Sequence, residues 1–265
     1  MPDSPRDPET PATQQKWPDR IYLVRHGQSA GNVARDAAEA AGEHWIDIAT
    51  RDVDVPLSAL GRSQAHALAE WFRALPPEQR PDAFFASPYQ RALETMTIVL
   101  DTGVFPDAHV VHDERLREKE FGVVDRMTKF GIKATYPQLD EQRSHVGKFY
   151  FRPPGGESWC DVILRLRSVI DTMTRDYTQR SVLIVAHQVV VNCFRYLFER
   201  MTERQILDLD RNADVPNCGV TLYEFDRALG DRGKLALRFA NFAAPLVEAG
   251  TPVTVAPDVP AAPKS

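Results

Sequence analysis

Four basic side chains of this sequence are candidates for chemistry on an anion. They are Arg25, His26, Arg91 and His187. Arg25 and His26 directly follow the apolar run 21–24, and His187 directly follows the run 181–186. Such runs are typical of strands buried in an α/β sheet, whose carboxyl ends form the edge at which ligands bind. We therefore expect these side chains to meet at one edge of a sheet.

Arg91 is expected at the same edge. It follows the expected buried strand 82–86 and lies in the first turn of a helix that we expect to start at Ser87 and Pro88. The helix dipole disfavours a cation in a first turn, so this position indicates either a bound anion or a salt-bridged surface arginine. The forked donors of two arginines match phosphate oxygens, so the set predicts a phosphoryl-binding site.

The histidines have a simpler alternative role. A single histidine at a strand end is more often a hydrogen-bonded core residue than a reactive one. Two buried strands that each end on a histidine, His26 and His187, favour a shared site instead. Because nearby arginines disfavour protonation, we expect His26 to stay neutral with a lone pair for nucleophilic attack. We expect His187 to stabilise the transferring group.

A carboxylate for proton transfer is expected in the charged segment 114–122, which contains Glu118 and Glu120. A solvated face is the usual alternative for such a segment. The following segment, 123–152, is locally basic and contains five aromatic residues. It is expected to be a lid-like insertion over an anionic site or an ordinary amphipathic excursion.

Strands and helices alternate along the expected elements. The expected strands are 21–24, 82–86, 108–111, 181–186 and 220–225. The two helices with expected bounds near the first strands are 59–74 and the segment from Ser87 to about Leu100. Two further helices are expected, one after a capping box at Ser158 and Asp161 and one from His187 to about Met201. This alternation predicts a three-layer α/β/α sandwich with a mostly parallel central sheet.

Length and composition predict one domain. The chain has 265 residues with 43% hydrophobic content, which is enough for a sizeable core over residues 19–244. Proline-rich tails at 1–18 and 245–265 are expected to be disordered. No signal peptide or membrane-spanning run is found, so we expect a cytoplasmic protein.

Several partners and cofactors are disfavoured. A net charge of -5 argues against nucleic-acid binding. The three cysteines, Cys160, Cys193 and Cys218, are scattered, which predicts reduced thiols rather than a disulfide framework or a metal site. No metal-ligand spacing, Walker A loop or dinucleotide fingerprint occurs, so no metal or cofactor is expected. The oligomeric state stays open.

Six motifs in order resemble the histidine phosphatase superfamily, the phosphoglycerate mutase-like proteins. They are IYLVRHGQSAGN, LSALGRSQA, SPYQRALET, LREKEFG, PPGGES and VLIVAH, and they extend over roughly residues 20–225. The resemblance implies the phosphoglycerate mutase-like fold and a phosphohistidine mechanism. It implies that His26 is the nucleophile and that Arg25, Asn32, Arg91 and His187 complete the phosphate pocket.

The same resemblance implies that Glu118 protonates the leaving oxygen and then activates water, with Glu120 as the competing candidate. One departure concerns Gln188, because the family commonly has glycine after its second histidine. We therefore expect Gln188 to contact the substrate in place of the usual backbone contact.

A second departure concerns the reaction. The paired arginines of the mutase branch are absent after Gly122, although Lys119, Arg143 and Arg152 are possible substitutes. This difference favours a metal-independent phosphomonoesterase that acts on a small phosphorylated substrate. The alternatives are a phosphoglycerate-type mutase and a catalytically inactive phosphate-binding or protein-interaction module.

Overall fold

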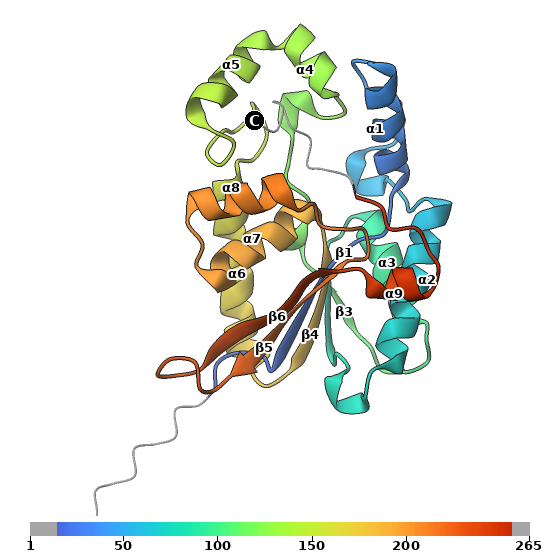
Figure 1. Cartoon of the computed structure of the whole chain (residues 1–265), viewed down its shortest axis with the longest axis vertical. Coiled ribbons are helices and arrows are strands. Elements are labelled where there is room, and N and C mark those ends of the chain that lie inside the picture. Colours follow the sequence, from blue (N-terminus) through green and yellow to red (C-terminus); the bar gives the residue numbers. More distant parts are fainter. Residues whose placement is uncertain (1–14, 256–265) are drawn as a thin grey trace, which may run out of the picture.

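A six-stranded mixed sheet forms the centre of the molecule, in a computed structural model that describes residues 15–255 (Figure 1). The strand order is β3-β2-β4-β1-β5-β6. The strands are β1 (Arg20–Arg25), β2 (Ala83–Ala86), β3 (Val110–His112), β4 (Ser181–Ala186), β5 (Val220–Asp226) and β6 (Lys234–Phe242). Strands β1 to β4 are parallel, and β5 and β6 run antiparallel to their neighbours. The sheet is therefore mostly parallel, as predicted.

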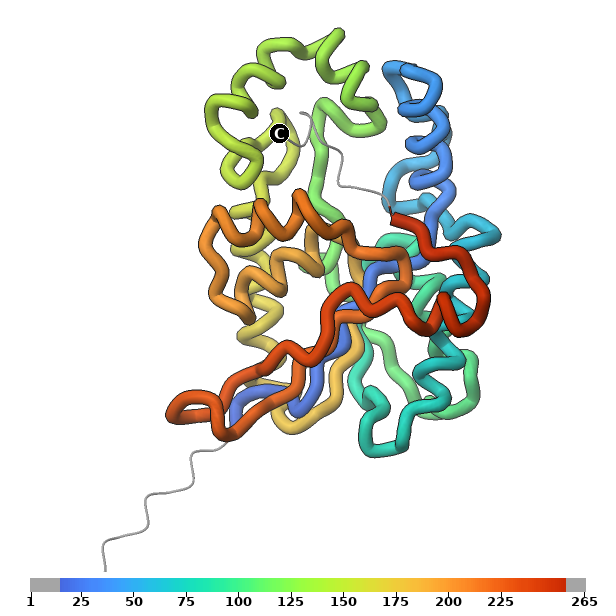
Figure 2. The backbone as a smooth tube through the Cα atoms, in the orientation of Figure 1, coloured from blue at the N-terminus to red at the C-terminus, as the bar shows by residue number. Residues whose placement is uncertain are grey.

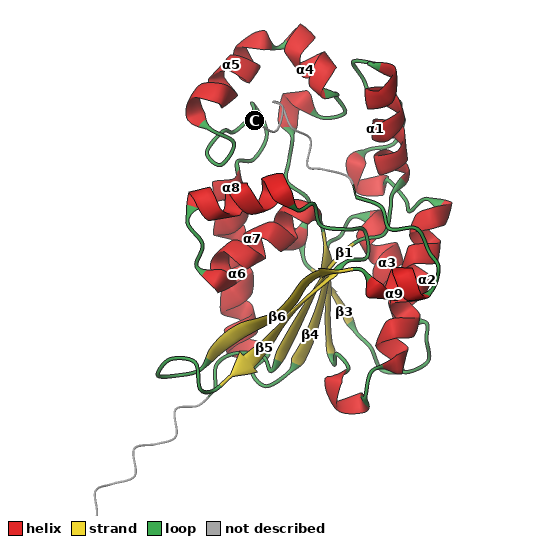
Figure 3. Cartoon of the chain, viewed as in Figure 1, coloured by secondary structure: helices red, strands yellow, loops and turns green. Residues whose placement is uncertain are grey.

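Helices cover both faces of the sheet, and Figure 3 shows the three layers. Helices α6 (Trp159–Asp176) and α7 (Gln188–Glu199) pack on one face, next to α8 (Glu203–Asn212). Helices α2 (Ala59–Ala74), α3 (Gln90–Leu100) and α9 (Ala244–Glu248) pack on the other. Because strand side chains alternate, Leu23 of β1 joins the α6–α7 core and Val24 joins the α2–α3 core. The predicted three-layer sandwich is confirmed.

A cap lies beyond the carboxyl ends of the parallel strands. It consists of α4 (Lys129–Thr135) and α5 (Pro137–Val146), which lie beside α1 (Ala30–Ala41) at the top of Figure 2. The cap has a small core of its own, formed by Val124, Met127, Ile132, Leu139 and Phe151. These residues belong to the segment 123–152 that was expected to be a lid-like insertion.

Short 3-10 helices complete the described elements. They are η1 (Asp52–Asp54), η2 (Pro77–Gln79), η3 (Glu114–Leu116) and η4 (Gly122–Val124). The described residues include no helix that is both long enough and apolar enough to cross a membrane. The three cysteines are free thiols, as expected.

The structure contains one strand that was not predicted and one helix whose start differs from the prediction. Strand β6 was not predicted. It is an edge strand whose side chains are all intermediate or exposed, and the alternation of Leu235, Leu237 and Phe239 along it was overlooked. Helix α3 begins at Gln90, after an N-cap at Tyr89, so Ser87 is not its cap. The hydroxyl of Ser87 is instead 2.8 Å from Nε2 of His187, so a contact distant in sequence replaces the expected local one.

Part of each segment that was expected to be a disordered tail packs against the rest of the domain. Within the predicted C-terminal tail, Leu246 of α9 is fully buried and Gln64 Nε2 donates to the carbonyl oxygen of Pro252 at 2.9 Å. Near the N-terminus, the Gln179 amide donates to the carbonyl oxygen of Trp17 at 3.1 Å. The predictions for residues 1–14 and 256–265 lie outside the described residues.

Candidate active site

His26 directly follows β1 and is nearly buried at the carboxyl edge of the sheet. Its Nδ1 is 2.6 Å from the carbonyl oxygen of Gly27. Because a carbonyl oxygen only accepts, the ring proton lies on Nδ1 and Nε2 carries the lone pair. Gly27 permits this arrangement, since a Cβ there would lie 2.5 Å from the carbonyl oxygen of Gly61 at the start of α2. The close contact between these two segments holds the histidine at the edge.

The imidazole of His26 is neutral near pH 7. Burial, followed by the charges of Arg91 and Arg25, holds the pKa of His26 well below its usual range. The same edge carries His187, whose ring centroid is 5.1 Å from that of His26. Burial and Arg91 also hold the pKa of His187 well below its usual range. The ends of β1 and β4 thus bring the two histidine rings next to each other, as expected.

Arg91 connects the nucleophile candidate to an acidic loop. Its Nε–H donates to Nε2 of His26 at 3.3 Å. Its Nη1 and Nη2 donate to the two carboxylate oxygens of Asp52 at 3.0 and 3.2 Å, and Nη1 also donates to the Asp52 carbonyl oxygen at 2.7 Å. The expected anion on this arginine is thus, in this structure, a carboxylate of the chain itself.

Arg25 is oriented by acceptors from two distant segments. Its Nη1 donates to Oε1 of Gln188 at 2.9 Å and to the carbonyl oxygen of Val215 at 2.6 Å. Burial lowers the pKa of Arg25 to about 10, which still leaves the guanidinium charged at neutral pH. Gln188 therefore positions a cation as well as lining the cavity.

His187 is not among the residues that line the described cavity, and it has no exposed surface. Its Nε2 is 2.8 Å from the hydroxyl oxygen of Ser87, and this hydroxyl accepts from the Tyr89 amide at 3.3 Å. Its Nδ1 is 3.7 Å from Oε2 of Glu118. The histidine thus has a hydroxyl on one nitrogen and the candidate acid near the other.

The two candidate acids lie in different surroundings. Glu118 lines the cavity and its side chain is 15% exposed. Glu120 does not line this cavity, its side chain is 47% exposed, and it accepts from the hydroxyl of Tyr89 at 3.1 Å. Of the two, only Glu118 lines the described cavity.

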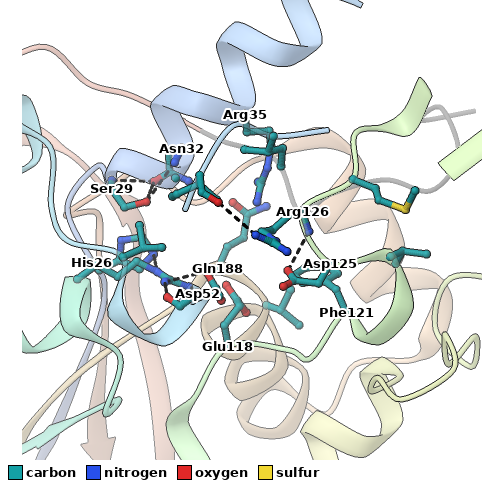
Figure 4. Close-up of a pocket in the computed structure, with 18 of the residues that line it drawn as sticks. His26, Ser29, Asn32, Arg35, Asp52, Glu118, Phe121, Asp125, Arg126 and Gln188 are labelled. Atoms are coloured by element: carbon teal, nitrogen blue, oxygen red, sulfur yellow. Dashed lines mark hydrogen bonds and ion pairs between the residues drawn. The ribbon is translucent and has the colours of Figure 1, made fainter. Parts of the chain in front are cut away.

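Asn32 lies in the first turn of α1 and lines the same cavity (Figure 4). Its Oδ1 accepts from the backbone amide of Ser29 at 2.9 Å, and its own backbone amide donates to the Ser29 hydroxyl at 3.1 Å, which together form a capping box. The cap occupies the oxygen and leaves the amide NH₂ as the donor that Asn32 offers to an anion.

The cavity has a volume of about 70 Å³ and also contains residues that sequence analysis missed. They are Arg35, Asp52, Asp125 and Arg126. Arg35 could have been found, because it lies three residues after Asn32 on the same helical face. No local sequence pattern marked Asp52, Asp125 or Arg126.

No group of three or more His, Cys, Asp or Glu side chains that could hold a metal ion occurs between residues 15 and 255. Of the cations considered as substitutes for the mutase arginines, Lys119, Arg143 and Arg152 all lie outside the described cavity lining. Arg152 forms an ion pair with Asp161 instead. Independence from metals stays a prediction.

The architecture and site can now be compared with known proteins. Residues 21–231 match the family model of the histidine phosphatase superfamily, branch 1. The chain belongs to this superfamily. This histidine phosphatase superfamily member is 30% identical over 229 residues to a phosphoglycerate mutase-like protein of Arabidopsis thaliana, covering 78% of this chain and 74% of the relative.

Other relatives are named for two kinds of reaction. The chain is 28% identical to 2,3-bisphosphoglycerate-dependent phosphoglycerate mutase 2 of Gloeobacter violaceus, over 74% of this chain and 83% of that protein. Its fold is similar to that of mycobacterial glucosyl-3-phosphoglycerate phosphatase in complex with inorganic phosphate, with a TM-score of 0.64 and 22% identity over 86% of this chain and 99% of that chain. The superfamily member is thus an enzyme of the histidine phosphatase type.

Proposed function

We propose that the protein is a metal-independent phosphomonoesterase that forms a phosphohistidine on Nε2 of His26. The observation that carries this proposal is the 2.6 Å distance between Nδ1 of His26 and the carbonyl oxygen of Gly27, which requires the ring proton on Nδ1. It leaves the Nε2 lone pair on the side where Arg91 donates. A nucleophile that is neutral and surrounded by cations suits attack on an anionic phosphoryl group.

In the first step, the Nε2 lone pair of His26 attacks phosphorus and the phosphorus–oxygen ester bond breaks. Protonated Glu118 gives its proton to the departing oxygen. Arg25 and Arg91 neutralise the charge on the phosphoryl oxygens, and Asn32 donates a further hydrogen bond. The Arg91 Nε–H, which donates to His26 in the free protein, then turns to a phosphoryl oxygen.

His187 is proposed to donate a hydrogen bond from Nδ1 to the transferring group. The hydroxyl of Ser87 accepts from the Tyr89 amide and has one proton to donate. When Ser87 donates that proton to Nε2 of His187, the ring proton lies on Nδ1, the nitrogen near Glu118. Ser87 thereby selects the useful tautomer.

In the second step, ionised Glu118 takes a proton from water and the water oxygen attacks the phosphohistidine. The nitrogen–phosphorus bond breaks, inorganic phosphate forms, and His26 recovers its lone pair. In a mutase, a substrate hydroxyl would take the place of this water. Hydrolysis is favoured here because the possible substitutes for the mutase arginines, Lys119, Arg143 and Arg152, do not line the described cavity.

The test is a phosphatase screen over phosphosugars, nucleotides, phosphorylated peptides and simple phosphomonoesters, with acid-quench trapping of phosphoenzyme. His26→Ala should abolish turnover and the acid-labile phosphoenzyme. The matched control is His66→Ala on the exposed face of α2, which should leave both unchanged.

Turnover at a tenth of the parent rate in His26→Ala would show that this histidine is structural. Isomerised product in excess of free phosphate would establish the mutase instead. Phosphate binding without turnover on any ester would identify a binding module.

A further inference from the structure

Apolar side chains line part of the cavity, and we call this part the roof. The side chains of the roof determine which leaving groups the cavity favours. We define the roof by its apolar lining residues Ile46, Ile48, Phe121, Val124 and Met127. They come from two segments that lie side by side, because the Ile46 amide donates to the Arg126 carbonyl oxygen at 2.9 Å and Trp45 pairs with Met127 in an antiparallel bridge. A leaving group bound to the phosphoryl group therefore meets a mainly apolar surface.

Charged groups in this cavity nearly balance. Its lining contains four arginines, Arg25, Arg35, Arg91 and Arg126, and three carboxylates, Asp52, Glu118 and Asp125. The surplus is one positive charge, whereas a phosphomonoester dianion brings two negative charges. Protonation of the catalytic carboxylic acid restores neutrality with one phosphoryl group bound. A second anionic group on the substrate would have no cation to balance it, which is unfavourable in a partly buried site.

Arg126 connects the two segments that form the roof. The guanidinium of Arg126 donates from Nη1 to the carbonyl oxygen of Ile48 at 3.2 Å, across the two segments. Its backbone amide donates to Oδ1 of Asp125 at 3.0 Å. Burial, together with the nearby Asp52 carboxylate, raises the pKa of Asp125. This direction indicates that the roof disfavours further negative charge.

We infer, on the basis of the proposed phosphatase function, that the preferred substrates are phosphomonoesters of uncharged and mainly apolar alcohols or phenols. Ile48 supplies apolar contact to the leaving group. Asp125 disfavours leaving groups that carry a carboxylate or a second phosphate.

The test compares three esters of primary alcohols, so that each requires protonation of an alkoxide leaving group. They are benzyl phosphate, 4-carboxybenzyl phosphate and glycerol 3-phosphate. We expect kcat/KM for benzyl phosphate to exceed the other two by about tenfold or more, the scale of a few apolar contacts. Calorimetric binding of benzylphosphonate and 4-carboxybenzylphosphonate should show the same order, and this measurement needs no turnover.

Two variants connect the preference to named residues. Ile48→Asn should lower kcat/KM for benzyl phosphate about tenfold and leave glycerol 3-phosphate within about twofold. Its control is Val33→Asn, on an exposed part of α1 outside the described cavity lining. Asp125→Asn should reduce the discrimination against 4-carboxybenzyl phosphate about fivefold. Its control is Asp47→Asn, which removes an exposed charge from the same loop as Ile48.

The outcomes separate this inference from the proposed function. Equal or reversed preference between the benzyl and carboxybenzyl compounds, in turnover or in phosphonate binding, overturns the inference and leaves the phosphatase intact. Preferred hydrolysis of glycerol 3-phosphate also overturns it. Phosphonate binding in the expected order without hydrolysis of any ester supports the inferred ligand class and overturns the phosphatase.

Discussion

Arg91 binds both carboxylate oxygens of Asp52 while its Nε–H donates to Nε2 of His26. The arginine that is proposed to bind a phosphoryl group therefore already holds an anion from its own chain. A phosphate that approaches His26 has to compete with that carboxylate for the same guanidinium.

Asp52→Asn should tighten the binding of inorganic phosphate. The amide keeps the shape of the side chain but removes the competing charge, and the Asp52 side chain is 40% exposed, so we expect a modest effect of about two- to fivefold. The inhibition constant of phosphate measures it. Asp54→Asn serves as control, because Asp54 pairs with Arg51 instead of Arg91. Weaker phosphate binding in Asp52→Asn would show that the carboxylate mainly orients the arginine.

Glu118→Gln should slow phosphoryl transfer from an alkyl phosphate by about 10²-fold or more, the usual scale for a general acid. An aryl ester such as p-nitrophenyl phosphate has a leaving group that needs little protonation. Its transfer to His26 should slow much less, and phosphoenzyme should accumulate as water activation becomes limiting. Rapid-quench burst kinetics on both esters measure the two steps.

Glu120→Gln is the matched comparison for this prediction. Because Glu120 bonds to the Tyr89 hydroxyl and does not line the described cavity, its substitution should change both bursts less than about threefold. Equal slowing of alkyl and aryl transfer in Glu118→Gln would remove Glu118 from the role of acid. An ester-dependent loss in Glu120→Gln would transfer the role to its neighbour.

Activity should survive chelation of metal ions. The cations that face the phosphoryl position are proposed to be the guanidinium groups of Arg25 and Arg91, which need no metal to supply positive charge. Turnover of benzyl phosphate measured before and after dialysis against EDTA checks this. Loss of turnover that a divalent ion restores would contradict a metal-independent mechanism.

Stability should fall as the pH drops below about 6.5, in part because of His26 and His187. Their folded-state pKa values lie well below that of an unfolded histidine, so the unfolded chain binds more protons in this range. When the pH falls from 7 to 5.5, each of these two histidines should contribute about 1 kcal/mol to the decrease in the free energy of unfolding. Urea unfolding at the two pH values measures the total loss.

His26→Gln isolates one of these contributions. The variant should lose about 1 kcal/mol less than the parent between the two pH values, whatever its stability at pH 7. A loss as large as the parent's would show that His26 is protonated in the folded protein near pH 6.

The positions of His26 and His187 could be predicted from the sequence because each ends a continuous apolar run. Burial on both faces of a parallel sheet leaves a signal in consecutive residues, and parallel strands bring their carboxyl ends to one edge. The same local reasoning predicted the capping box of Ser158 and Asp161, which the structure confirms. It also predicted the range of α2 as Ala59–Ala74.

Other contacts could be decided only by the tertiary structure. Ser87 lies in a context that is typical of a helix cap, but its hydroxyl is bound to His187, 100 residues away in the chain. Asp52 lies in a loop without periodicity and meets Arg91 across 39 residues. Side-chain contacts of this kind depend on how separate elements pack, and no property of the neighbouring residues encodes them.

The choice between Glu118 and Glu120 also depended on tertiary structure. The two carboxylates lie two residues apart in an irregular segment, and a charge-rich segment without helical or strand periodicity does not specify which side chain faces inward. The course of the backbone between η3 and η4 directs Glu118 to the cavity and leaves Glu120 half exposed beside Tyr89. Sequence periodicity thus determined which strand ends carry the histidines, whereas packing between distant segments determined which carboxylates reach them.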